Sequence, residues 1–248
     1  MQNKKNTTTV LITGAAQRLG KAIACACADN GLSVIIHYNR SKVAAEKLCN
    51  ELAEKAISAI PLQADLANII GYDDFIKKAI ALSEGSLGGI INNAATFPAD
   101  TIDTMTYDSL NAALRINAWA PLALSRAFAR HVHSGSIVNI LDSRLPKFDR
   151  THCSYSLSKH LFYVITMLCA SEFAPKIRVN AVAPGLILPP AGETDAYVEN
   201  LINKIPLHKK GTADDVAQAV IFLLRNNYIT GEIIYVDGGR NAVGTQNP

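Results

Sequence analysis

A tyrosine and a lysine four residues apart, Tyr155 and Lys159, are the residues of this sequence whose types and spacing best suit chemistry. Residues at this spacing lie on one face of a helix, so the ammonium group of Lys159 is expected beside the phenol oxygen of Tyr155. A free phenol has a pKa near ~10, and a neighbouring cation lowers that value toward neutrality, where the phenol can donate or accept a proton. Amphipathic helices also carry this spacing by chance, so the pair alone does not establish a function.

Asp142 precedes Tyr155 by thirteen positions and is a third residue with candidate chemistry. An ionised carboxylate cannot donate to a carbonyl oxygen, but it can accept hydrogen bonds from a ligand or help to pass a proton through water. Two other roles are open: Asp142 could cap the loop at Ser143 and Arg144, or it could form a surface ion pair with Arg144.

A glycine-containing turn from Thr13 to Gly20 follows the first apolar run and opens the first helical pattern. Such a turn lets backbone amides approach a pyrophosphate at the N-terminus of a helix. The match to the G-x-G-x-x-G fingerprint is incomplete, since only Gly14 and Gly20 are glycine and Arg18 stands where a small residue is expected. An ordinary strand-to-helix turn is the alternative.

Arg40 and Ser41 stand where an NAD-binding enzyme has an acidic residue, about twenty residues past the glycine turn. A carboxylate there would bind the ribose hydroxyls and repel a 2′-phosphate, whereas arginine offers a charged fork and serine a further donor. An opposite-charge pair about 4 Å apart near a surface is worth roughly 4 kcal/mol before desolvation, so we predict NADPH over NADH. The alternative is that Arg40 and Lys42 only solvate the start of a helix.

Short apolar runs alternate with helical patterns along the chain, which is typical of βαβ units and predicts an α/β protein with a seven-stranded parallel sheet. The predicted strands are Val10–Ile12, Ser33–Tyr38, Ala59–Leu62, Gly89–Ile91, Ser136–Leu141, Arg178–Val182 and Glu232–Val236. Helices are predicted at Leu19–Asn30 and, after the capping residue Thr212, at Ala213–Arg225. Leu161–Ala170 is apolar nearly all round, so this helix is expected deep in the core or against another subunit.

Candidate ligand-binding residues also follow later strands. Asp65 and Leu66 come after the third strand, where the carboxylate could accept from an adenine amino group, and Asn92-Asn93-Ala94-Ala95 comes after the fourth. Because open α/β sheets bind ligands at the carboxyl ends of their strands, these segments are expected to share one crevice with the glycine turn. The segment at about 185–206 contains several prolines and is expected to form a flap over that crevice.

The composition excludes several classes of protein. The 248 residues are 49% hydrophobic, so residues 1–248 are expected to form one domain around a large core. The formal charge of +3 arises from 24 basic and 21 acidic residues without a basic tail, which disfavours nucleic acid as a partner. No stretch reaches about 18 apolar residues and the N-terminus lacks a secretory signal, so we expect a cytoplasmic protein with no membrane partner.

Neither the cysteines nor the histidines point to a metal site. The five cysteines show no C-x-x-C spacing and are expected as reduced thiols, with Cys153 either reactive or a small packing residue. His131 and His133 lack a third ligand at a recognisable spacing and are expected in an exposed loop. His152 and His160 flank the tyrosine and lysine, but proton transfer does not require them.

In order and spacing these segments, together with Asn117 and Pro184-Gly185, resemble the short-chain dehydrogenase/reductase family along nearly the whole chain. The resemblance implies a Rossmann-like doubly wound three-layer fold, NADP binding and a homotetramer. Within the family, the residues that resemble the pteridine reductase branch, which includes dihydromonapterin and alternative dihydrofolate reductases, are Arg18, His37-Tyr38-Asn39-Arg40-Ser41, Phe97 and Asp142. Ala95 departs from the branch, where serine is common, and from the wider family, where glycine is common.

The resemblance also implies roles for individual residues. The implied catalytic residues are Asp142, Tyr155, Lys159 and Asn117, with Lys159 bonded to the nicotinamide ribose and Asn117 holding a water for proton resupply. The implied cofactor-binding residues are Gly14, Gln17, Arg18, Leu19, His37, Tyr38, Asn39, Arg40, Ser41, Asp65, Leu66, Asn93, Ala94, Ala95, Tyr155, Lys159, Pro184 and Gly185. The implied substrate-binding residues are Arg18, Phe97, Asp142, Tyr155 and Leu188. Phe97 would stack on a pterin, although most aromatic side chains simply pack in a core.

NADPH-dependent reduction of a dihydropteridine is therefore the first functional hypothesis, with hydride delivered to C6 and a proton to N5. Most of the family has serine at position 142 to polarise a carbonyl, whereas the carboxylate of Asp142 would oppose the alkoxide that forms there. The alternatives are a carbonyl reductase acting on a 3-oxoacyl thioester and a module that senses NADPH without turnover.

Overall fold

Seven parallel strands form one sheet in the computed structural model, which describes residues 8–145, 148–189, 201–203 and 205–242. The strands run in the order β3-β2-β1-β4-β5-β6-β7, and every neighbouring pair is parallel. Their bounds are β1 Thr9–Ile12, β2 Ser33–Tyr38, β3 Ala59–Gln63, β4 Leu87–Asn92, β5 Gly135–Ile140, β6 Ile177–Pro184 and β7 Ile233–Val236. All seven predicted strands and the Rossmann-like fold are confirmed.

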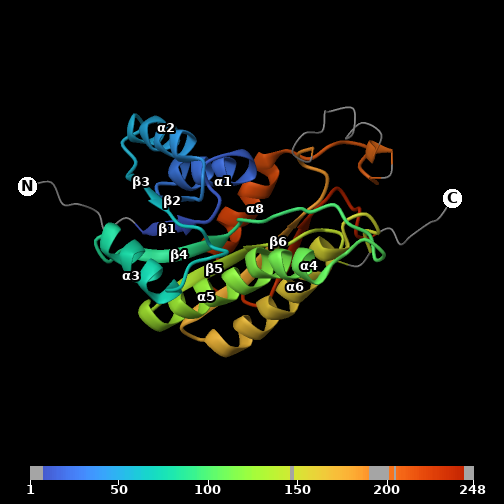
Figure 1. The fold of residues 1–248 in the computed structure, drawn as a ribbon. Coiled ribbons are helices and arrows are strands. Elements are labelled where there is room, and N and C mark those ends of the chain that lie inside the picture. The colour runs from blue at the N-terminus through green and yellow to red at the C-terminus, as the bar shows by residue number, and fades with distance from the viewer. Residues whose placement is uncertain (1–7, 146–147, 190–200, 204, 243–248) are drawn as a thin grey trace, which may run out of the picture.

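Helices cover both faces of the sheet (Figure 1). The bounds are α1 Arg18–Asp29, α2 Lys42–Ala53, α3 Tyr72–Leu82, α4 Tyr107–Leu114, α5 Ala120–His131, α6 Cys153–Phe173 and α8 Ala213–Arg225, with a π-helical turn η1 at Arg115–Trp119. Helices α1, α2 and α8 pack on one face, and α3, α4, α5 and α6 lie on the other. The predicted capping box of α8 is present, because Thr212 and Asp215 exchange side-chain and backbone hydrogen bonds.

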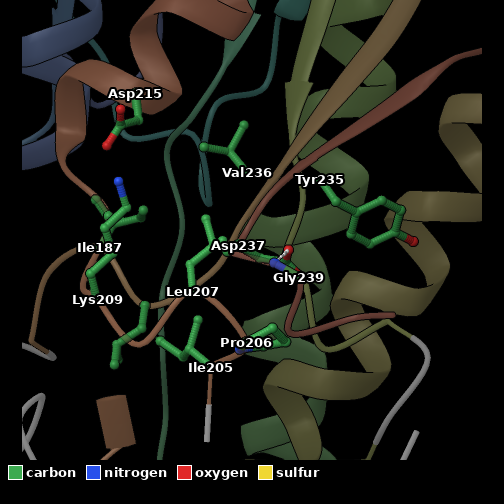
Figure 2. Close-up of a pocket in the computed structure, with 13 residues that line it drawn as sticks. Ile187, Ile205, Pro206, Leu207, Lys209, Asp215, Tyr235, Val236, Asp237 and Gly239 are labelled. Carbon is green, nitrogen blue, oxygen red and sulfur yellow. Dashed lines mark hydrogen bonds between the residues drawn. The ribbon is translucent and has the colours of Figure 1, made fainter. Parts of the chain in front are cut away.

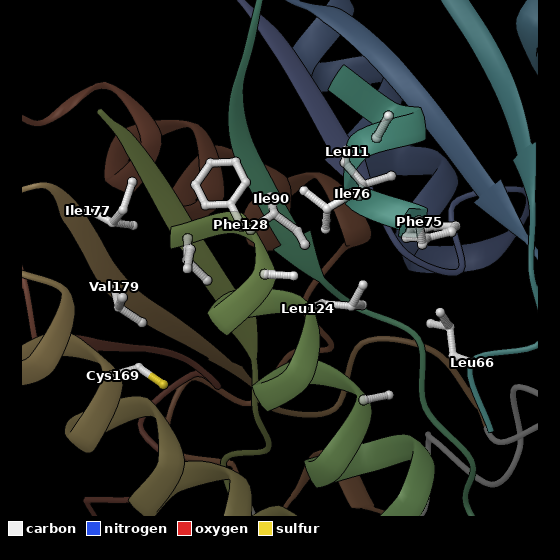
Figure 3. Close-up of a cluster of buried hydrophobic side chains, with 14 of the residues drawn as sticks. Leu11, Leu66, Phe75, Ile76, Ile90, Leu124, Phe128, Cys169, Ile177 and Val179 are labelled. Carbon is white, nitrogen blue, oxygen red and sulfur yellow. The ribbon is translucent and has the colours of Figure 1, made fainter. Parts of the chain in front are cut away.

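The two layers of helices enclose two hydrophobic clusters. In β1, Val10 and Ile12 belong to the cluster under α1 and α8, whereas Leu11 between them belongs to the cluster under α3 and α5. Figure 3 shows part of the second cluster, in which Phe128 of α5 packs near Ile90 of β4. A parallel sheet buried on both faces explains why the predicted strands are continuous apolar runs rather than alternating patterns.

The strand order reverses between β1 and β4, whose neighbours lead away in opposite directions along the sheet. At such a switch point the loops that follow the carboxyl ends of the strands diverge and leave a crevice for a ligand. The glycine turn follows β1 and the Asn93 segment follows β4, so the fold places both predicted segments at this crevice.

Candidate active site

The glycine turn is held in a conformation that requires glycine at two positions. Gly14 has φ +62°, in the left-handed region, and a Cβ added at Gly20 would lie 2.2 Å from the carbonyl oxygen of Gly14. Asn93 ties the end of β4 to this turn, because its Nδ2 donates to the carbonyls of Thr13 at 2.9 Å and Gly14 at 3.2 Å. The turn therefore lies against the loop after β4 as a rigid unit.

His37 supports the turn from behind. Its side chain is only 2% exposed, its Nδ1 accepts the Gly14 backbone N–H at 3.0 Å, and its Nε2 lies 3.2 Å from the Ala64 carbonyl. These partners require the neutral tautomer with its proton on Nε2, and burial lowers the pKa of His37 to about 4. His37 was predicted among the cofactor contacts, but it does not line the cleft, so its effect on a cofactor would be indirect.

A cleft of about 760 Å³ opens in front of the turn, along the carboxyl ends of β1 to β4. The predicted cofactor-binding residues that line it are Gly14, Gln17, Arg18, Leu19, Tyr38, Asn39, Arg40, Ser41, Asp65, Asn93, Ala94 and Ala95. Leu66 does not, because its side chain is 4% exposed and packs in the core with α3. The cleft thus unites the segments that were expected to share one crevice.

Positive charge lies where the second strand ends. Arg40 and Ser41 form one wall of the cleft, and the acidic residue nearest to them in that wall is Asp65. Hydrogen bonds from Asn68 and from the backbone N–H of Ala67 lower the pKa of Asp65, and the charge of Arg40 acts in the same direction. This wall therefore suits a phosphate next to Arg40 better than a ribose held by a carboxylate.

Tyr155 and Asp142 are directly hydrogen-bonded. The hydroxyl of Tyr155 donates to Oδ2 of Asp142 at 2.8 Å, and the tyrosine is 9% exposed. Burial, followed by the negative charge of Asp142, raises the pKa of Tyr155 well above its ordinary value. The predicted lowering of this pKa by Lys159 is therefore wrong, and the phenol is protonated at neutral pH.

Lys159 lies on the same side of α6 but makes a different contact from the one expected. Its Nζ donates to the Ile140 carbonyl at 2.7 Å and lies 5.7 Å from the centroid of the Tyr155 ring. Burial lowers the pKa of Lys159 to about 8, opposed by the charge of Asp142. The ammonium group is anchored to the end of β5, beside the aromatic ring.

Arg144 forms a bidentate ion pair with Asp142. Its Nε donates to Oδ1 at 2.9 Å, its Nη2 to Oδ2 at 2.8 Å, and its backbone N–H to Oδ1 at 2.8 Å. Asp142 thus caps the loop and also pairs with Arg144, so both of the other roles considered for it are present. The ion pair is internal and not on the surface, because the side chains of Asp142 and Arg144 are 15% and 23% exposed. Burial opposes ionisation, yet the bonds from Arg144 hold the pKa of Asp142 below its ordinary value.

The ion pair is part of a series of side-chain contacts that was not predicted from the sequence. Arg144 also binds Asp149, whose Oδ2 lies 3.0 Å from Nδ1 of His152. The His152 ring stacks on Phe97, with centroids 3.9 Å apart and planes at 15°. Phe97 is 37% exposed and meets the Tyr155 ring edge-on at 4.6 Å, so it is a wall of the site and not a core residue.

Asn117 occupies the π-helical turn between α4 and α5, an irregularity often found at functional sites. Its Oδ1 accepts the Thr96 N–H at 2.8 Å, and its Nδ2 donates to the Thr96 carbonyl and to Ser158 Oγ, each at 2.9 Å. The side chain thus fastens the loop after β4 to α6, and its predicted contact with a water stays a prediction.

A pocket of about 700 Å³ extends from these residues to Leu188 and Pro189, which belong to the segment predicted as a flap. All five predicted substrate-binding residues line it, and the lining also includes Arg144, His152, Gly185 and Arg240. Arg18, at φ +53°, donates through Nη2 to the Pro189 carbonyl and so reaches across the pocket mouth. The flap expected at about 185–206 stays a prediction, because residues 190–200 and 204 lie outside the described residues.

A neighbouring cavity of about 490 Å³ lies on the other side of Leu186 and is mostly apolar (Figure 2). Its two carboxylates accept backbone hydrogen bonds. Asp215 accepts the Thr212 N–H at 2.8 Å, and Asp237 accepts the N–H groups of Gly239 at 2.9 Å and Asn241 at 2.6 Å. Both carboxylates of this cavity are therefore engaged by backbone N–H groups.

Other predicted features have plain outcomes. All five cysteines are free, and Sγ of Cys153 lies 3.6 Å from the Arg150 carbonyl. His131 pairs with Asp73 at 3.0 Å. In the described ranges no group of three or more His, Cys, Asp or Glu side chains could hold a metal ion. Nor does any described helix combine the length and apolar character needed to cross a bilayer.

Comparison with known proteins places this geometry among nicotinamide-dependent reductases. Residues 14–241 match the family model described as enoyl-(acyl carrier protein) reductase. The chain is 32% identical to pteridine reductase 1 of Leishmania tarentolae, covering 92% of this chain and 94% of that protein. It is 29% identical to dihydromonapterin reductase of Klebsiella pneumoniae, covering 93% and 95%, and 29% identical to 3-oxoacyl-[acyl-carrier-protein] reductase FabG of Staphylococcus aureus, covering 95% and 98%.

A solved structure supports the same comparison. FolM alternative dihydrofolate reductase 1 from Brucella suis, crystallised in complex with NADP, superimposes with a TM-score of 0.92 at 30% identity, covering 97% of this chain and 98% of that one. The pteridine-related reductases and the 3-oxoacyl-[acyl-carrier-protein] reductase are thus similar to this chain to nearly the same degree. The choice between these two kinds of substrate depends on the site itself.

Proposed function

The chain belongs to the short-chain dehydrogenase/reductase family, as an NAD(P)-dependent oxidoreductase, and we propose that it uses NADPH to reduce a dihydropteridine to the tetrahydro form. The observation that carries the proposal is the hydrogen bond from Tyr155 to an ionised Asp142, at the position where most of the family has serine. Bound NADPH would supply the hydride, and the protein's own residues would orient the rings and provide the proton.

The preference for NADPH rests on the cleft wall at Arg40 and Ser41. The planar guanidinium can grip a 2′-phosphate with two hydrogen bonds, and the serine hydroxyl adds a third donor. Gly14, Asn93 and Ala94 leave the backbone close to the cleft, where a pyrophosphate would lie at the start of α1. The residues present therefore fit a phosphorylated dinucleotide.

The proton would come from Tyr155. Because burial and Asp142 raise its pKa, the phenol enters the reaction protonated and can donate once a stronger acceptor arrives. A negative carboxylate beside the phenol opposes the growth of an alkoxide, so a carbonyl substrate is poorly served. A ring nitrogen such as N5 of a dihydropterin gains its proton without becoming an anionic oxygen, and this acceptor suits the site better.

The pocket walls suit a flat heteroaromatic ring. Phe97 offers a partly exposed aromatic surface, and the guanidinium of Arg144 lies 5.3 Å from its ring centroid. Arg18 and Leu188 line the same pocket. A pterin carries carbonyl and ring-nitrogen acceptors that arginine side chains can bind, which supports this substrate class.

Self-association as a homotetramer is part of the proposal. The middle of α6 exposes a row of apolar side chains, with Leu161 at 44%, Val164 at 48% and Leu168 at 64%. Of the two expectations for this helix, packing against another subunit fits the exposed face better than deep burial.

A carbonyl reductase acting on a 3-oxoacyl thioester is the second candidate, favoured by the 29% identity to FabG. The experiment is a panel in which purified protein is given NADPH or NADH with dihydrobiopterin, dihydromonapterin, dihydrofolate or acetoacetyl thioester. The proposal predicts NADPH oxidation with at least one of the three pteridines. Turnover of the thioester alone would replace it with the second candidate.

A further inference from the structure

The hydrogen-bonding capacity of Asp142 is completely used by the protein. A carboxylate has about four lone-pair positions. Oδ1 accepts the backbone N–H of Arg144 at 2.8 Å and its Nε at 2.9 Å. Oδ2 accepts Nη2 of Arg144 at 2.8 Å and the hydroxyl of Tyr155 at 2.8 Å. A substrate could reach this carboxylate only by displacing one of these donors.

Arg144 is itself held from two sides. Its guanidinium bridges Asp142 and Asp149, and Asp149 is fixed in turn by the Thr151 N–H at 2.9 Å and hydroxyl at 2.7 Å. The guanidinium also lies 5.3 Å from the ring centroid of Phe97 and 5.5 Å from that of Tyr155. A group fastened in this way does not swing aside easily, so the position of Asp142 is set by Arg144.

We propose that Arg144 is a positioning residue for the reaction: by occupying three lone pairs of Asp142 it reserves the fourth for the hydroxyl of Tyr155. Asp142 then acts on Tyr155 and is not a direct partner of the substrate, which revises its expected role as a substrate contact. Both residues of the ion pair line the pocket, but the acceptor positions of Asp142 are occupied by Arg144 and Tyr155. The inference deepens the proposed function and rests on it for the identity of the reaction, but its geometry belongs to the protein alone.

The groups around Asp142 show that its ionised form depends mainly on Arg144. Among the described residues, the groups that act on Asp142 are Arg144 from the loop between β5 and α6, and Tyr155 and Lys159 from α6, while Asp149 pairs with Arg144 and His152. Of the two described cations that act on Asp142, Arg144 is hydrogen-bonded to it, whereas Lys159 is bonded to Ile140. Without Arg144, the Tyr155 hydrogen bond and the charge of Lys159 remain, but the main interactions that oppose the effect of burial on Asp142 are lost, and the carboxyl group should protonate more easily.

The first test needs neither cofactor nor substrate. Protein labelled with ¹³C in the aspartate carboxyl carbons is titrated by NMR, and the Asp142 signal is assigned by its absence in Asp142→Asn. We expect the Asp142 carboxyl to stay ionised to lower pH than a free aspartate in the parent protein and to titrate at clearly higher pH in Arg144→Gln. Arg150→Gln, which removes an exposed arginine of the same loop, is the matched control and should leave the Asp142 titration unchanged. An unchanged Asp142 titration in Arg144→Gln would overturn the inference.

The second test is a double-mutant cycle on the rate of NADPH oxidation. Arg144→Gln should lower kcat by at least about tenfold, with the KM for NADPH within about twofold, because the cofactor cleft is untouched. In the Asp142→Asn background the same substitution should have little further effect, because Arg144 acts through Asp142. Equal losses in both backgrounds would show an independent structural role and contradict the inference.

Two further measurements keep these tests decisive. If Arg144→Gln does not fold, Arg144→Lys keeps the charge but loses the planar fork, and it should show a smaller change of the same kind in both tests. If the protein turns over no pteridine, the proposed function fails, whereas the NMR titration still decides the role of Arg144.

Discussion

The hydroxyl of Tyr155 donates a 2.8 Å hydrogen bond to Oδ2 of Asp142, a carboxylate that Arg144 holds in its ionised form. The phenol is therefore buried and protonated, and its hydroxyl points at an anion. A substrate that accepts the proton has to compete with Asp142 for it, and that competition favours a basic ring nitrogen over a carbonyl oxygen.

Replacing Tyr155 by phenylalanine tests the source of the proton. The ring keeps its contacts with Phe97 and Arg144, so folding should be preserved while the hydroxyl is lost. We expect kcat for pteridine reduction to fall by about 100-fold or more, as for other general acids, and the Kd for NADPH to change little. Stopped-flow NADPH oxidation and NADPH fluorescence measure the two quantities. A kcat close to that of the parent protein would mean that another group supplies the proton.

Asp142→Ser tests the choice between the two candidate substrates. A serine hydroxyl can donate to a carbonyl oxygen, whereas the carboxylate cannot. The variant should lose pteridine turnover and gain activity with acetoacetyl thioester, both followed as NADPH oxidation. Pteridine turnover that survives or improves in the serine variant would argue against the role given to the carboxylate.

Cofactor preference should depend on Arg40. Exchanging it for aspartate places a carboxylate where a 2′-phosphate would lie, so we expect the KM for NADPH to rise by at least about tenfold and the KM for NADH to fall. Lys42→Gln is the control, because Lys42 pairs with Glu46 at 3.7 Å on the exposed side of α2. Similar effects of the two substitutions would mean that Arg40 contributes only general positive charge.

The buried His37 should make the fold sensitive to acid. Its pKa is lowered to about 4 in the folded protein, so between pH 6.5 and 4 the unfolded chain binds a proton that the folded chain does not. The free energy of unfolding should therefore fall as the pH drops through this window, by up to about 3 kcal/mol. Urea unfolding at pH 7 and pH 4.5 measures the loss.

The matched variants for this prediction are His37→Asn and His133→Asn. Asparagine at position 37 can still accept the Gly14 N–H through its amide oxygen but does not titrate, so this variant should lose less stability on acidification than the parent protein. His133 is exposed, and its replacement should leave the acid sensitivity as it was. Identical pH dependence in the parent and His37→Asn would refute the assignment.

The exposed face of α6 predicts an assembly that one charge can disrupt. Leu168→Glu places a carboxylate at the most exposed position of the apolar row, whereas Val43→Glu places one on α2, where the side chain is 80% exposed. Light scattering after size exclusion should give a tetramer for the parent and Val43→Glu, and a smaller species for Leu168→Glu. A monomeric parent protein would remove the proposed interface.

The sheet was predictable because buried parallel strands are continuous apolar runs, and the cleft was predictable because strand ends meet at one edge. The burial of His37 was readable too, since it lies two positions after Ile35 in β2 and so shares the face covered by α3. The ion pairs of Arg144 could not be predicted, because they depend on the path of an irregular loop that brings Asp142 and Asp149 to one guanidinium group. The pKa of Tyr155 was mispredicted because sequence spacing placed a cation near the phenol, whereas the fold buries the phenol and the loop after β5 places the Asp142 carboxylate beside it.

The most direct test of the proposed reaction follows the hydride itself. The protein is incubated with NADPH that carries two deuterium atoms at C4 of the nicotinamide and, in separate reactions, with dihydromonapterin, dihydrofolate or acetoacetyl thioester, and the products are examined by NMR. A tetrahydropteridine carrying one deuterium at C6 is expected. A panel in which deuterium appears only in the hydroxyl-bearing carbon of a reduced acyl thioester, with every pteridine recovered unlabelled, would contradict it.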